Sequence, residues 1–383
     1  MKKLLFSLLG MCLTLAGCKK NAPQPPGTPP VAAVTTLKIG HVGHDHQLAL
    51  YAAMDYWNEF PDTGISLKTI EAQKFYELYD KGTKIADLEI IKVGGGSLMP
   101  TALAQGVIDI GIGGVPAVMS AADSGSPVKL ISPLHSRGDM FVVAPANPIT
   151  TWDDFVKTAL AAQTPIRIGY KDPAAVAKLI FEQALTHEGI SFSEDAGRLD
   201  VKVHLVNVKG EGKLNLSLGS NLVEGYVGNN PHAAIAVDQK IGKIICDLED
   251  LPPGNFKNHP CCCIGANTDA IRHKAQAITA VLVLCKQATA MIHGNLDKSV
   301  DAAVHWLGTS RTVEQMSIPT SGYSMDRDTD WQTSMDHWII AMNKLGHFKG
   351  QLKGLTPQQA CDKVYDFSLL NAAEQRFETI KEH

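Results

Sequence analysis

The chain has few charged and few aromatic residues. Charged residues make up 19% and aromatic residues 6% of its 383 residues, and the formal net charge is -4 at pH 7. A mildly acidic chain of this kind is not expected to bind nucleic acid. Beyond residue 16 we find no apolar run long enough to span a bilayer, so no transmembrane helix is expected there.

Common catalytic and metal-binding motifs are also missing. There is no G-x-S-x-G elbow, and the glycine-rich segment 94–97 lacks the lysine and the spacing of a nucleotide-binding loop. No H-E-x-x-H motif occurs, and the triplet Cys261, Cys262 and Cys263 does not resemble a C-x-x-C zinc pair. The triplet favours small buried residues in a strand, or alternatively a disulfide to Cys246 or Cys285. These absences disfavour an enzyme, and no cofactor and no metal ligand are assigned.

The first residues indicate export. Lys2 and Lys3 precede an apolar stretch over residues 4–16, and Leu15-Ala16-Gly17-Cys18 resembles a bacterial lipoprotein box. The resemblance implies a signal peptide over 1–17 and lipidation of Cys18, although an ordinary signal peptide with an incidental cysteine remains an alternative. Residues 18–36 are rich in proline and predict a semi-rigid tether. The expected location is the cell envelope, on a membrane and facing the periplasm or the exterior.

From residue 37 the chain alternates short apolar strands with helices, a pattern typical of α/β folds with a parallel sheet covered on both faces. About 350 residues exceed one ordinary core, so two lobes are expected. The predicted first lobe comprises 37–139 and 265–383, and the second lobe comprises 140–264. The strands are expected at 37–42, 65–70, 88–93, 107–112, 128–134, 166–170, 201–206 and 223–227, and late helices at 275–294, 296–307, 313–317 and 328–345.

The order of these elements resembles the type II periplasmic-binding-protein fold. It is similar to solute-binding lipoproteins of ABC importers for nitrate, sulfonates, taurine, bicarbonate or thiamine-precursor pyrimidines. The resemblance rests on the segments 37–41, 106–111 with Val115-Pro116-Ala117, and 224–231. It implies a clamshell with a helical C-terminal extension, with crossings between the lobes near 137–140 and 264–267.

The resemblance further implies a small anion, or a sulfonate-like or pyrimidine-like organic solute, bound between the lobes and delivered to an ABC permease. A metal-binding or ligand-sensing lipoprotein with the same clamshell is the alternative function.

Turns at strand ends supply the candidate ligand-binding residues. Glycines there leave backbone N–H groups accessible, arginine can hold an oxyanion with two hydrogen bonds, and asparagine both donates and accepts. The candidates are His44, Asp45, His46, Gly95, Gly96, Ser97, Gly114, Val115, His135, Arg137, Tyr170, Asp172, Asn229 and Asn230.

The turn over residues 44–46 leaves three uses open: contact with the ligand, helix capping or exposure to solvent, and metal ligation. Its possible metal-binding partners are His41, His135, His232 and Asp109.

Overall fold

The computed structural model describes residues 34–381. The predicted signal peptide, Cys18 and nearly all of the predicted tether lie outside the described residues. The first strand begins at Thr35, so residues 35 and 36 belong to a strand and not to the tether.

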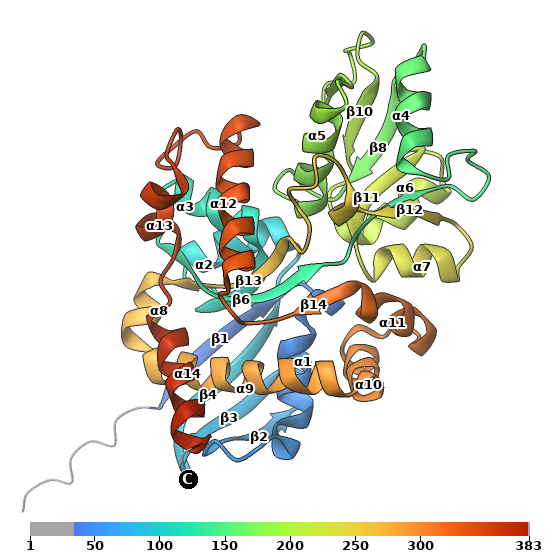
Figure 1. The fold of residues 1–383 in the computed structure, drawn as a ribbon. Coiled ribbons are helices and arrows are strands. Elements are labelled where there is room, and N and C mark those ends of the chain that lie inside the picture. The colour runs from blue at the N-terminus through green and yellow to red at the C-terminus, as the bar shows by residue number, and fades with distance from the viewer. Residues whose placement is uncertain (1–33, 382–383) are drawn as a thin grey trace, which may run out of the picture. The chain divides into compact units, whose positions relative to one another are not determined.

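The first sheet has eight strands, and the described chain begins directly before one of them and ends in a helix, α14 (Ser368–Lys381) (Figure 1). Its strands, in spatial order, are β14 (Ser321–Tyr323), β6 (Val128–Arg137), β13 (Pro260–Asn267), β5 (Ile110–Gly114), β1 (Thr35–His41), β4 (Thr83–Lys92), β3 (Phe75–Asp80) and β2 (Ile65–Glu71). The strands β4, β1 and β5 run parallel to one another, as predicted.

The edges of this sheet differ from the prediction. β2, β3 and β4 form an antiparallel meander, and β13 and β14 also pair antiparallel to their neighbours. β3 was not expected from the sequence, although Tyr76 and Leu78 alternate with more exposed neighbours as a half-buried strand requires. The sheet is therefore mixed rather than parallel.

The second sheet has six strands. In spatial order these are β12 (Lys243–Asp247), β7 (Asp139–Val143), β11 (Gly225–Asn229), β8 (Ile166–Tyr170), β10 (Val203–Asn207) and β9 (Phe192–Ser193). Its helices are α4 (Trp152–Ala161), α5 (Val176–His187), α6 (Leu214–Gly219) and α7 (His232–Asp238). The β7 residues Met140 and Val142 pack with α6 and α7, whereas Phe141 packs against aromatic residues of α4 and α5.

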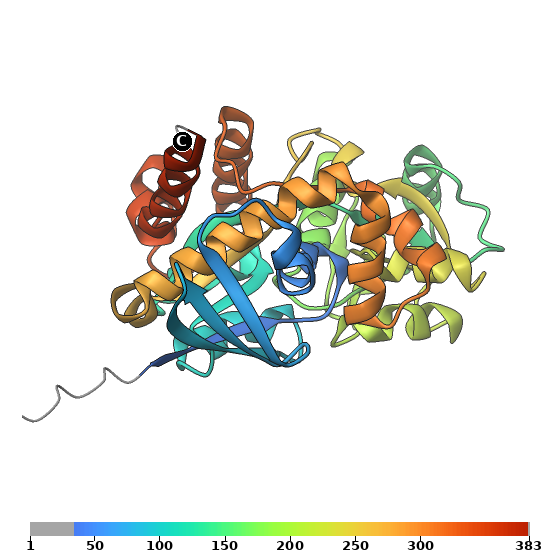
Figure 2. The same cartoon turned by 90° about the horizontal axis from the view of Figure 1, so that it is seen from below.

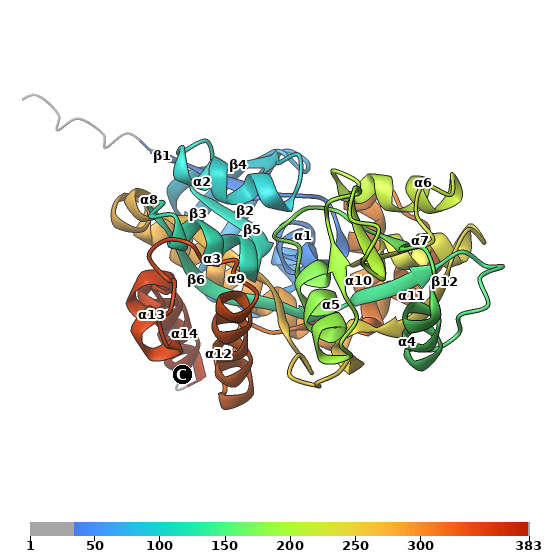
Figure 3. The same cartoon turned by 90° about the horizontal axis from the view of Figure 1, so that it is seen from above.

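The remaining helices accompany the first sheet. They are α1 (Leu48–Tyr56), α2 (Met99–Ala104), α3 (Val115–Asp123), α8 (Thr268–His273), α9 (Ala275–Gly294), α10 (Leu296–Leu307), α11 (Arg311–Ser317), α12 (Thr329–Lys344), α13 (Pro357–Val364) and α14 (Ser368–Lys381). Seen from below, α9 runs across the strands of this sheet (Figure 2). Seen from above, α2 and α3 lie over the opposite face (Figure 3). The predicted two-lobed α/β clamshell with a helical C-terminal region is confirmed.

Helix α9 corrects the expectation that no apolar run beyond residue 16 is long enough to span a bilayer. Within the described residues, α9 is long and apolar enough to cross a membrane by length and composition, although 67% of its most apolar window is buried inside the protein. α9 packs against α1 and α14, as the core helix of a globular protein does. A buried core helix can be as long and as apolar as a membrane-spanning helix, so the length and composition of α9 are only weak evidence for membrane insertion.

The chain passes between the two sheets at two places. The first crossing is at Gly138, between β6 and β7, within the predicted segment 137–140. The second lies between β12 and β13, which places it before Pro260. The predicted crossing at 264–267 is wrong, because this segment belongs to β13 of the first sheet. Apolar continuity alone does not distinguish a crossing from a buried strand.

Candidate solute-binding site

A glutamine fixes the histidine-containing turn after β1. Gln47 Oε1 accepts hydrogen bonds from the backbone N–H groups of Val42 and Gly43, at 2.9 and 3.1 Å. Gln47 Nε2 donates to the carbonyl of Ile112 in β5 at 2.9 Å. The side chain thereby satisfies buried backbone groups of the turn and ties the turn to a neighbouring strand. His44 and His46 are held in place by this arrangement.

A small cavity lies between residues of the two lobes, next to this turn. Its volume is about 30 Å³, which is enough for about two water molecules or one ion. The first lobe contributes His44, His46, Cys261 and Cys262 to its wall, among others. The second lobe contributes, among others, residues at the ends of three of its strands: Asp139 begins β7, Asn229 ends β11, and Lys171 and Asp172 follow β8.

A larger cleft adjoins the small cavity. Its volume is about 730 Å³, within the range of small-molecule sites. The turn 94–96 after β4 and the segment 209–213 before α6 form opposite parts of its wall. Val42, Gly96, Lys171 and Asp172 line both spaces, so the two spaces share a wall. Charged side chains lining the cleft are Lys92, Lys171, Asp172, Lys209, Glu211 and Lys213.

Lys171 is the central cation of the shared wall. Its ammonium lies 3.0 Å from Glu211 Oε2 and donates to Asn229 Oδ1 at 2.7 Å. Burial alone would lower the pKa of Lys171, but the carboxylates of Glu211 and Asp172 outweigh it and hold the pKa above its usual value. Burial likewise opposes ionisation of Glu211, yet Lys171 and His232 hold its pKa below the usual value. Both partners are therefore charged at neutral pH.

Two further carboxylates of the small cavity differ in their surroundings. Burial would raise the pKa of Asp139, but the hydrogen bond with His259 Nε2, at 3.2 Å, and nearby His46 hold it below its usual value. Burial raises the pKa of Asp172, and Lys171 offsets only part of this effect. Asp139 is thus a buried anion, whereas burial makes ionisation of Asp172 less favourable.

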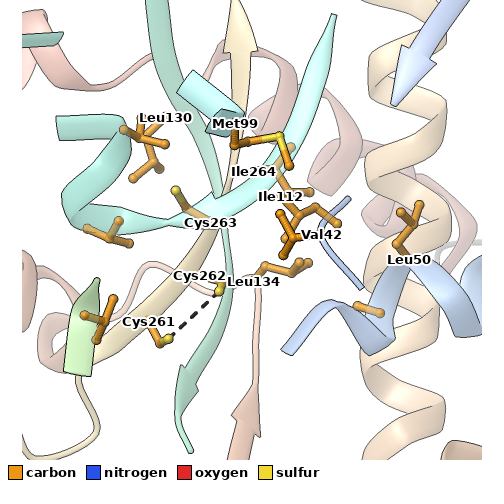
Figure 4. Packing of buried hydrophobic residues seen from close by; sticks show 14 of the residues in the cluster. Val42, Leu50, Met99, Ile112, Leu130, Leu134, Cys261, Cys262, Cys263 and Ile264 are labelled. Atoms are coloured by element: carbon orange, nitrogen blue, oxygen red, sulfur yellow. Dashed lines mark hydrogen bonds between the residues drawn. The ribbon is translucent and has the colours of Figure 1, made fainter. Parts of the chain in front are cut away.

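Three buried histidines and two cysteines lie beside the small cavity. The rings of His46 and His135 stack with their centroids 3.7 Å apart, and His44 approaches His46 edge-on at 4.9 Å. Burial is the largest cause that lowers the pKa of each of these histidines, so all three are neutral at pH 7. Cys261 Sγ lies 3.4 Å from His46 Nδ1 and 3.9 Å from Cys262 Sγ (Figure 4).

Several predicted ligand-binding residues do line these spaces. They are His44, His46, Gly95, Gly96, Gly114, Asp172 and Asn229. Ser97 lies in the short 3-10 helix η3 (Gly96–Leu98), directly after the glycines. Gly114 is the last residue of β5 and not part of a separate turn. Sequence reasoning found these positions because they follow strands.

Other predicted residues serve packing or hydrogen bonding away from the two spaces. Asp45 is fully buried and accepts a hydrogen bond from Ser317 Oγ, and Val115 is buried in the core at the start of α3. The Tyr170 hydroxyl donates to Glu194 Oε2 at 2.7 Å. Asn230 Nδ2 donates to Thr320 Oγ1 at 2.8 Å, across to the segment after α11.

Arg137 also lies apart from the lining residues. Its Nη2 donates to the Ser321 carbonyl at 3.2 Å, and its Nη1 lies 3.6 Å from Glu249 Oε1. These partners come from β14 of the first sheet and from the connection that follows β12 of the second. Arg137 therefore links the two lobes next to the first crossing. His135, its neighbour in β6, contacts His46 rather than the cavity itself.

The prediction did not include five residues of the site: Asp139, Lys171, Glu211, Cys261 and Cys262. Lys171 directly follows β8, so the rule that selected Tyr170 and Asp172 also points to it. Asp139 begins β7 directly after the crossing, a position that can be recognised only once the crossing is known. Glu211 belongs to a loop far along the chain, and no local pattern marks it.

Comparison with known proteins places the chain in a family. The model of the NMT1-like family matches residues 35–307, which is most of the described chain. The chain belongs to the NMT1-like family. The uncharacterized protein MJ1180 of Methanocaldococcus jannaschii is 36% identical to this NMT1-like chain over 143 residues, which is 36% of this chain and 92% of that protein.

Solved structures similar to this NMT1-like protein share its fold. The zinc-bound ligand-binding component of an ABC-type import system from Staphylococcus aureus has a TM-score of 0.67 at 16% identity, over 88% of this chain and 99% of that chain. The nitrate-binding protein NrtA from Synechocystis PCC 6803 has a TM-score of 0.65 at 14% identity, over 90% of this chain and 89% of that chain.

The alkanesulfonate-binding protein SsuA from Xanthomonas axonopodis pv. citri, bound to MOPS, has a TM-score of 0.60 at 12% identity, over 88% of this chain and 97% of that chain. These likenesses confirm the predicted fold, and the family match over residues 35–307 confirms the predicted family resemblance. The three solved structures are described as ligand-binding, nitrate-binding and alkanesulfonate-binding proteins.

Proposed function

We propose that this protein is the extracytoplasmic solute-binding component of an ABC importer and that it holds a small organic anion in the cleft of about 730 Å³. The fold supports this function, because NrtA binds nitrate and SsuA binds alkanesulfonates on the same architecture. The partner is an ABC permease that receives the solute.

The balance of charge in the cleft carries the proposal. Four lysines and two carboxylates line it, which leaves an excess of two positive charges. One of the four, Lys171, is largely buried, so its charge is screened less by salt than that of the exposed Lys92. Such a site attracts an anion from solvent and retains it.

The glycine turn provides room for the solute. Gly95 has φ +152°, and a Cβ atom added there meets no atom within 4 Å, so the backbone of the turn faces open space. Lys92, Val93 and Leu98 flank this turn in the wall of the cleft. A solute of ordinary metabolite size can therefore approach the backbone N–H groups of residues 94–96, whose partial positive charge suits an anion.

Closure of the lobes would enclose the solute. The cleft is lined from both lobes, and the chain crosses between them at Gly138 and through residues 248–259, as in proteins that close by hinge motion. Exclusion of water strengthens the electrostatic contacts within the cleft.

We also propose that the mature protein is attached to a membrane through Cys18. The lipoprotein-like segment 15–18 supports this proposal, and the proline-rich segment that follows gives the reach that a receptor needs to meet a permease.

A ligand screen tests the proposed function. Chelator-treated protein is titrated calorimetrically with nitrate, aliphatic sulfonates, short carboxylates and a pyrimidine phosphate. We expect one equivalent of an anion to bind. In the double variant Lys92→Met/Lys213→Met the affinity should fall about 5- to 30-fold, the equivalent of about 1–2 kcal/mol.

The matched control is Lys157→Met, which removes an exposed lysine of α4 outside the cleft and should bind like the wild type. If the tightest solute is neutral or cationic, or if the double variant binds an anion as well as the control does, the proposal is wrong.

A further inference from the structure

Four buried side chains lie at or beside the small cavity, and none of them lines the larger cleft in which the anion is proposed to bind. His46, His135, Cys261 and Cys262 each offer one ligand atom, and these atoms all lie within 4.8 Å of one another. Each of the four side chains is less than 5% exposed. Two imidazoles and two thiols brought together in this way form a set of soft and borderline metal ligands.

An irregular strand brings the two cysteines to one side. Along β13 the pairing with β6 shifts between Pro260 and Cys262, so that Cys261 is an extra residue. An extra residue interrupts the alternation of side chains across a strand, and the sulfur atoms of Cys261 and Cys262 consequently face one another. Cys263 points away from the pair, and its Sγ lies 3.7 Å from the carbonyl oxygen of Gly113 (Figure 4).

Strand pairing also places His135 at this point. Cys262 and His135 are direct partners across β13 and β6. Cross-strand partners have their side chains close together. His46 reaches the same point from η1 (Asp45–Gln47) and stacks on the His135 ring. Three separate segments of the first lobe therefore supply the four ligands, and the second lobe is not needed to form the set.

Three of the four ring nitrogens of this cluster lack hydrogen-bond partners among the described residues, and the fourth, His46 Nδ1, faces Cys261 Sγ. Among residues 34–381, neither ring nitrogen of His135 has a hydrogen-bond partner, although the side chain is 3% exposed. His46 Nε2 is likewise unpartnered and the side chain is fully buried. Buried polar atoms are normally paired, so the two unpaired ring nitrogens of His135, a side chain that stacks on His46 and pairs across the strands with Cys262, are consistent with a missing ligand at this point.

The distances fit a tetrahedral ion. With usual zinc–sulfur and zinc–nitrogen bond lengths, neighbouring ligand atoms of a tetrahedral site lie about 3.3–3.8 Å apart. The separations here are 3.9 Å between the two sulfur atoms and 3.4 Å between Cys261 Sγ and His46 Nδ1. All four ligand atoms lie within 4.8 Å of one another, so binding of an ion would draw some of them about 1 Å closer together.

We propose that His46, His135, Cys261 and Cys262 form a tetrahedral site for a single transition-metal ion of the zinc or copper(I) class. On binding, the two thiols release their protons to solvent, and the resulting thiolates balance the charge of a divalent ion. His46, Cys261 and Cys262 line the small cavity, which gives the ion a route from the cleft.

Asp45 completes the arrangement as a positioning residue. Its Oδ1 lies 3.9 Å from His46 Nε2, and neither atom has a hydrogen-bond partner among the described residues. If His46 binds the ion through Nδ1, as its distance to Cys261 suggests, Nε2 carries the proton and faces the carboxyl group of Asp45. A carboxyl group behind a metal-bound histidine orients the ring and increases its basicity.

The metal site does not depend on the proposed anion transport, because it is formed within the first lobe. It supports the alternative function of a metal-binding protein only if the ion itself is the cargo.

Metal analysis of the mature protein tests the inference. Chelator-treated, reduced protein is loaded with Zn²⁺ or Co²⁺ in the absence of any anionic solute, and the metal content is measured after desalting. We expect one ion per chain. The Co²⁺ form should show the intense visible absorption of a tetrahedral ion together with thiolate-to-cobalt charge transfer.

Variants assign the ligands. Cys261→Ser, Cys262→Ser and His135→Gln should each weaken Zn²⁺ binding by more than about 100-fold, whereas Asp45→Asn should weaken it by about 10- to 100-fold. Cys263→Ala and Cys285→Ala are matched controls that also remove a buried sulfur, and both should retain the ion. Circular dichroism establishes that each variant is folded.

Two results would overturn the inference. One is a folded, reduced wild-type protein that retains no Zn²⁺ or Co²⁺ after desalting. The other is a Co²⁺ spectrum without thiolate charge transfer, or one that Cys261→Ser and Cys262→Ser leave unchanged. Because no anion is present, neither result bears on the proposed solute binding.

Discussion

Lys171 and Glu211 form an ion pair of 3.0 Å in which each side chain is only 14% exposed. Lys171 follows a strand of the second sheet, and Glu211 comes from the loop that precedes α6. The pair belongs to the wall of the cleft, and Lys171 also faces the small cavity. A buried pair of this kind is costly to break, since removal of one partner leaves the other charge without compensation.

Lys171→Met should therefore reduce both stability and anion binding. We expect the free energy of unfolding to fall by about 3–5 kcal/mol, because Glu211 loses its partner in a poorly solvated position. Urea denaturation measures this change. The control is Arg198→Met, which removes one member of the exposed Arg198–Asp200 pair and should cost no more than about 1 kcal/mol. Equal losses in the two variants would contradict the importance of the buried pair.

Gly95→Ala tests the glycine turn of the cleft. Gly95 has φ +152° and ψ +159°, a region that only glycine adopts without strain, so alanine should cost about 1–3 kcal/mol. We also expect weaker anion binding, measured by calorimetry, because the turn lines the cleft. Gly82→Ala is matched in kind, since Gly82 has φ +76° and open space around its Cβ position. Because Gly82 lies between β3 and β4, away from the cleft, the Gly82→Ala variant should lower the stability without changing the affinity for the anion.

Asp247→Asn should change the dependence of stability on pH. Burial raises the pKa of Asp247 from 3.8 to about 6. When a carboxyl group has a higher pKa in the folded state than in the unfolded state, its protonated form favours the folded state. This stabilisation is complete at pH values below the unfolded pKa, and it is lost as the pH rises through the folded pKa. The asparagine variant avoids the cost of a buried charge while still accepting the hydrogen bond from Glu249 N–H.

The variant should therefore be more stable than the wild type by about 1–2 kcal/mol at about pH 8, after allowance for partial exposure, and should show no such advantage at about pH 4. Thermal unfolding at both pH values measures the difference. An advantage of the same size at both values would mean that ionisation of Asp247 is not its cause.

Cys18→Ala should release the protein from membranes and leave the affinity for the solute unchanged. The reason is that Cys18 lies outside the described fold and is the only proposed attachment point. Fractionation of cells by ultracentrifugation, with detection of the protein in pellet and supernatant, makes the measurement. Continued recovery of the variant in the membrane pellet would count against lipidation.

Local signals explain how much of the fold could be predicted. N-cap residues and helical periodicity can be recognised in the sequence. The structure places α9 and α10 at the expected bounds, 275–294 and 296–307. Thr151 caps α4 in a capping box with Asp154, as its position before the helix indicates. Such features depend on neighbouring residues alone.

The missing parts depend on distant residues. Antiparallel pairing of β3 with β2 and β4 requires knowledge of which strands meet, although Gly82 in the turn between β3 and β4 is a local signal that the prediction did not use. The approach of His135 to Cys262 depends on strand register and on the extra residue Cys261, none of which a local pattern reveals. The three cysteines were correctly expected to be buried in a strand, whereas the alternative disulfide is wrong, because the six cysteines of the described chain are free.

The candidate site divides in the same way. The expectation that turns at strand ends face the ligand selected Gly95, Gly96, His44, His46, Asp172 and Asn229, which line the two spaces. The same expectation selected Arg137 and Tyr170, whose side chains bind Glu249 and Glu194 instead of facing the cleft. The direction of a side chain depends on partners that lie far away in the sequence.

A crystal structure of the protein with its tightest-binding anion would test the central claim most directly. The account predicts that the anion occupies the cleft and lies within hydrogen-bonding distance of Lys171 or of the backbone N–H groups of residues 94–96. An anion bound elsewhere on the protein, or a cleft occupied by a cationic solute, would contradict it.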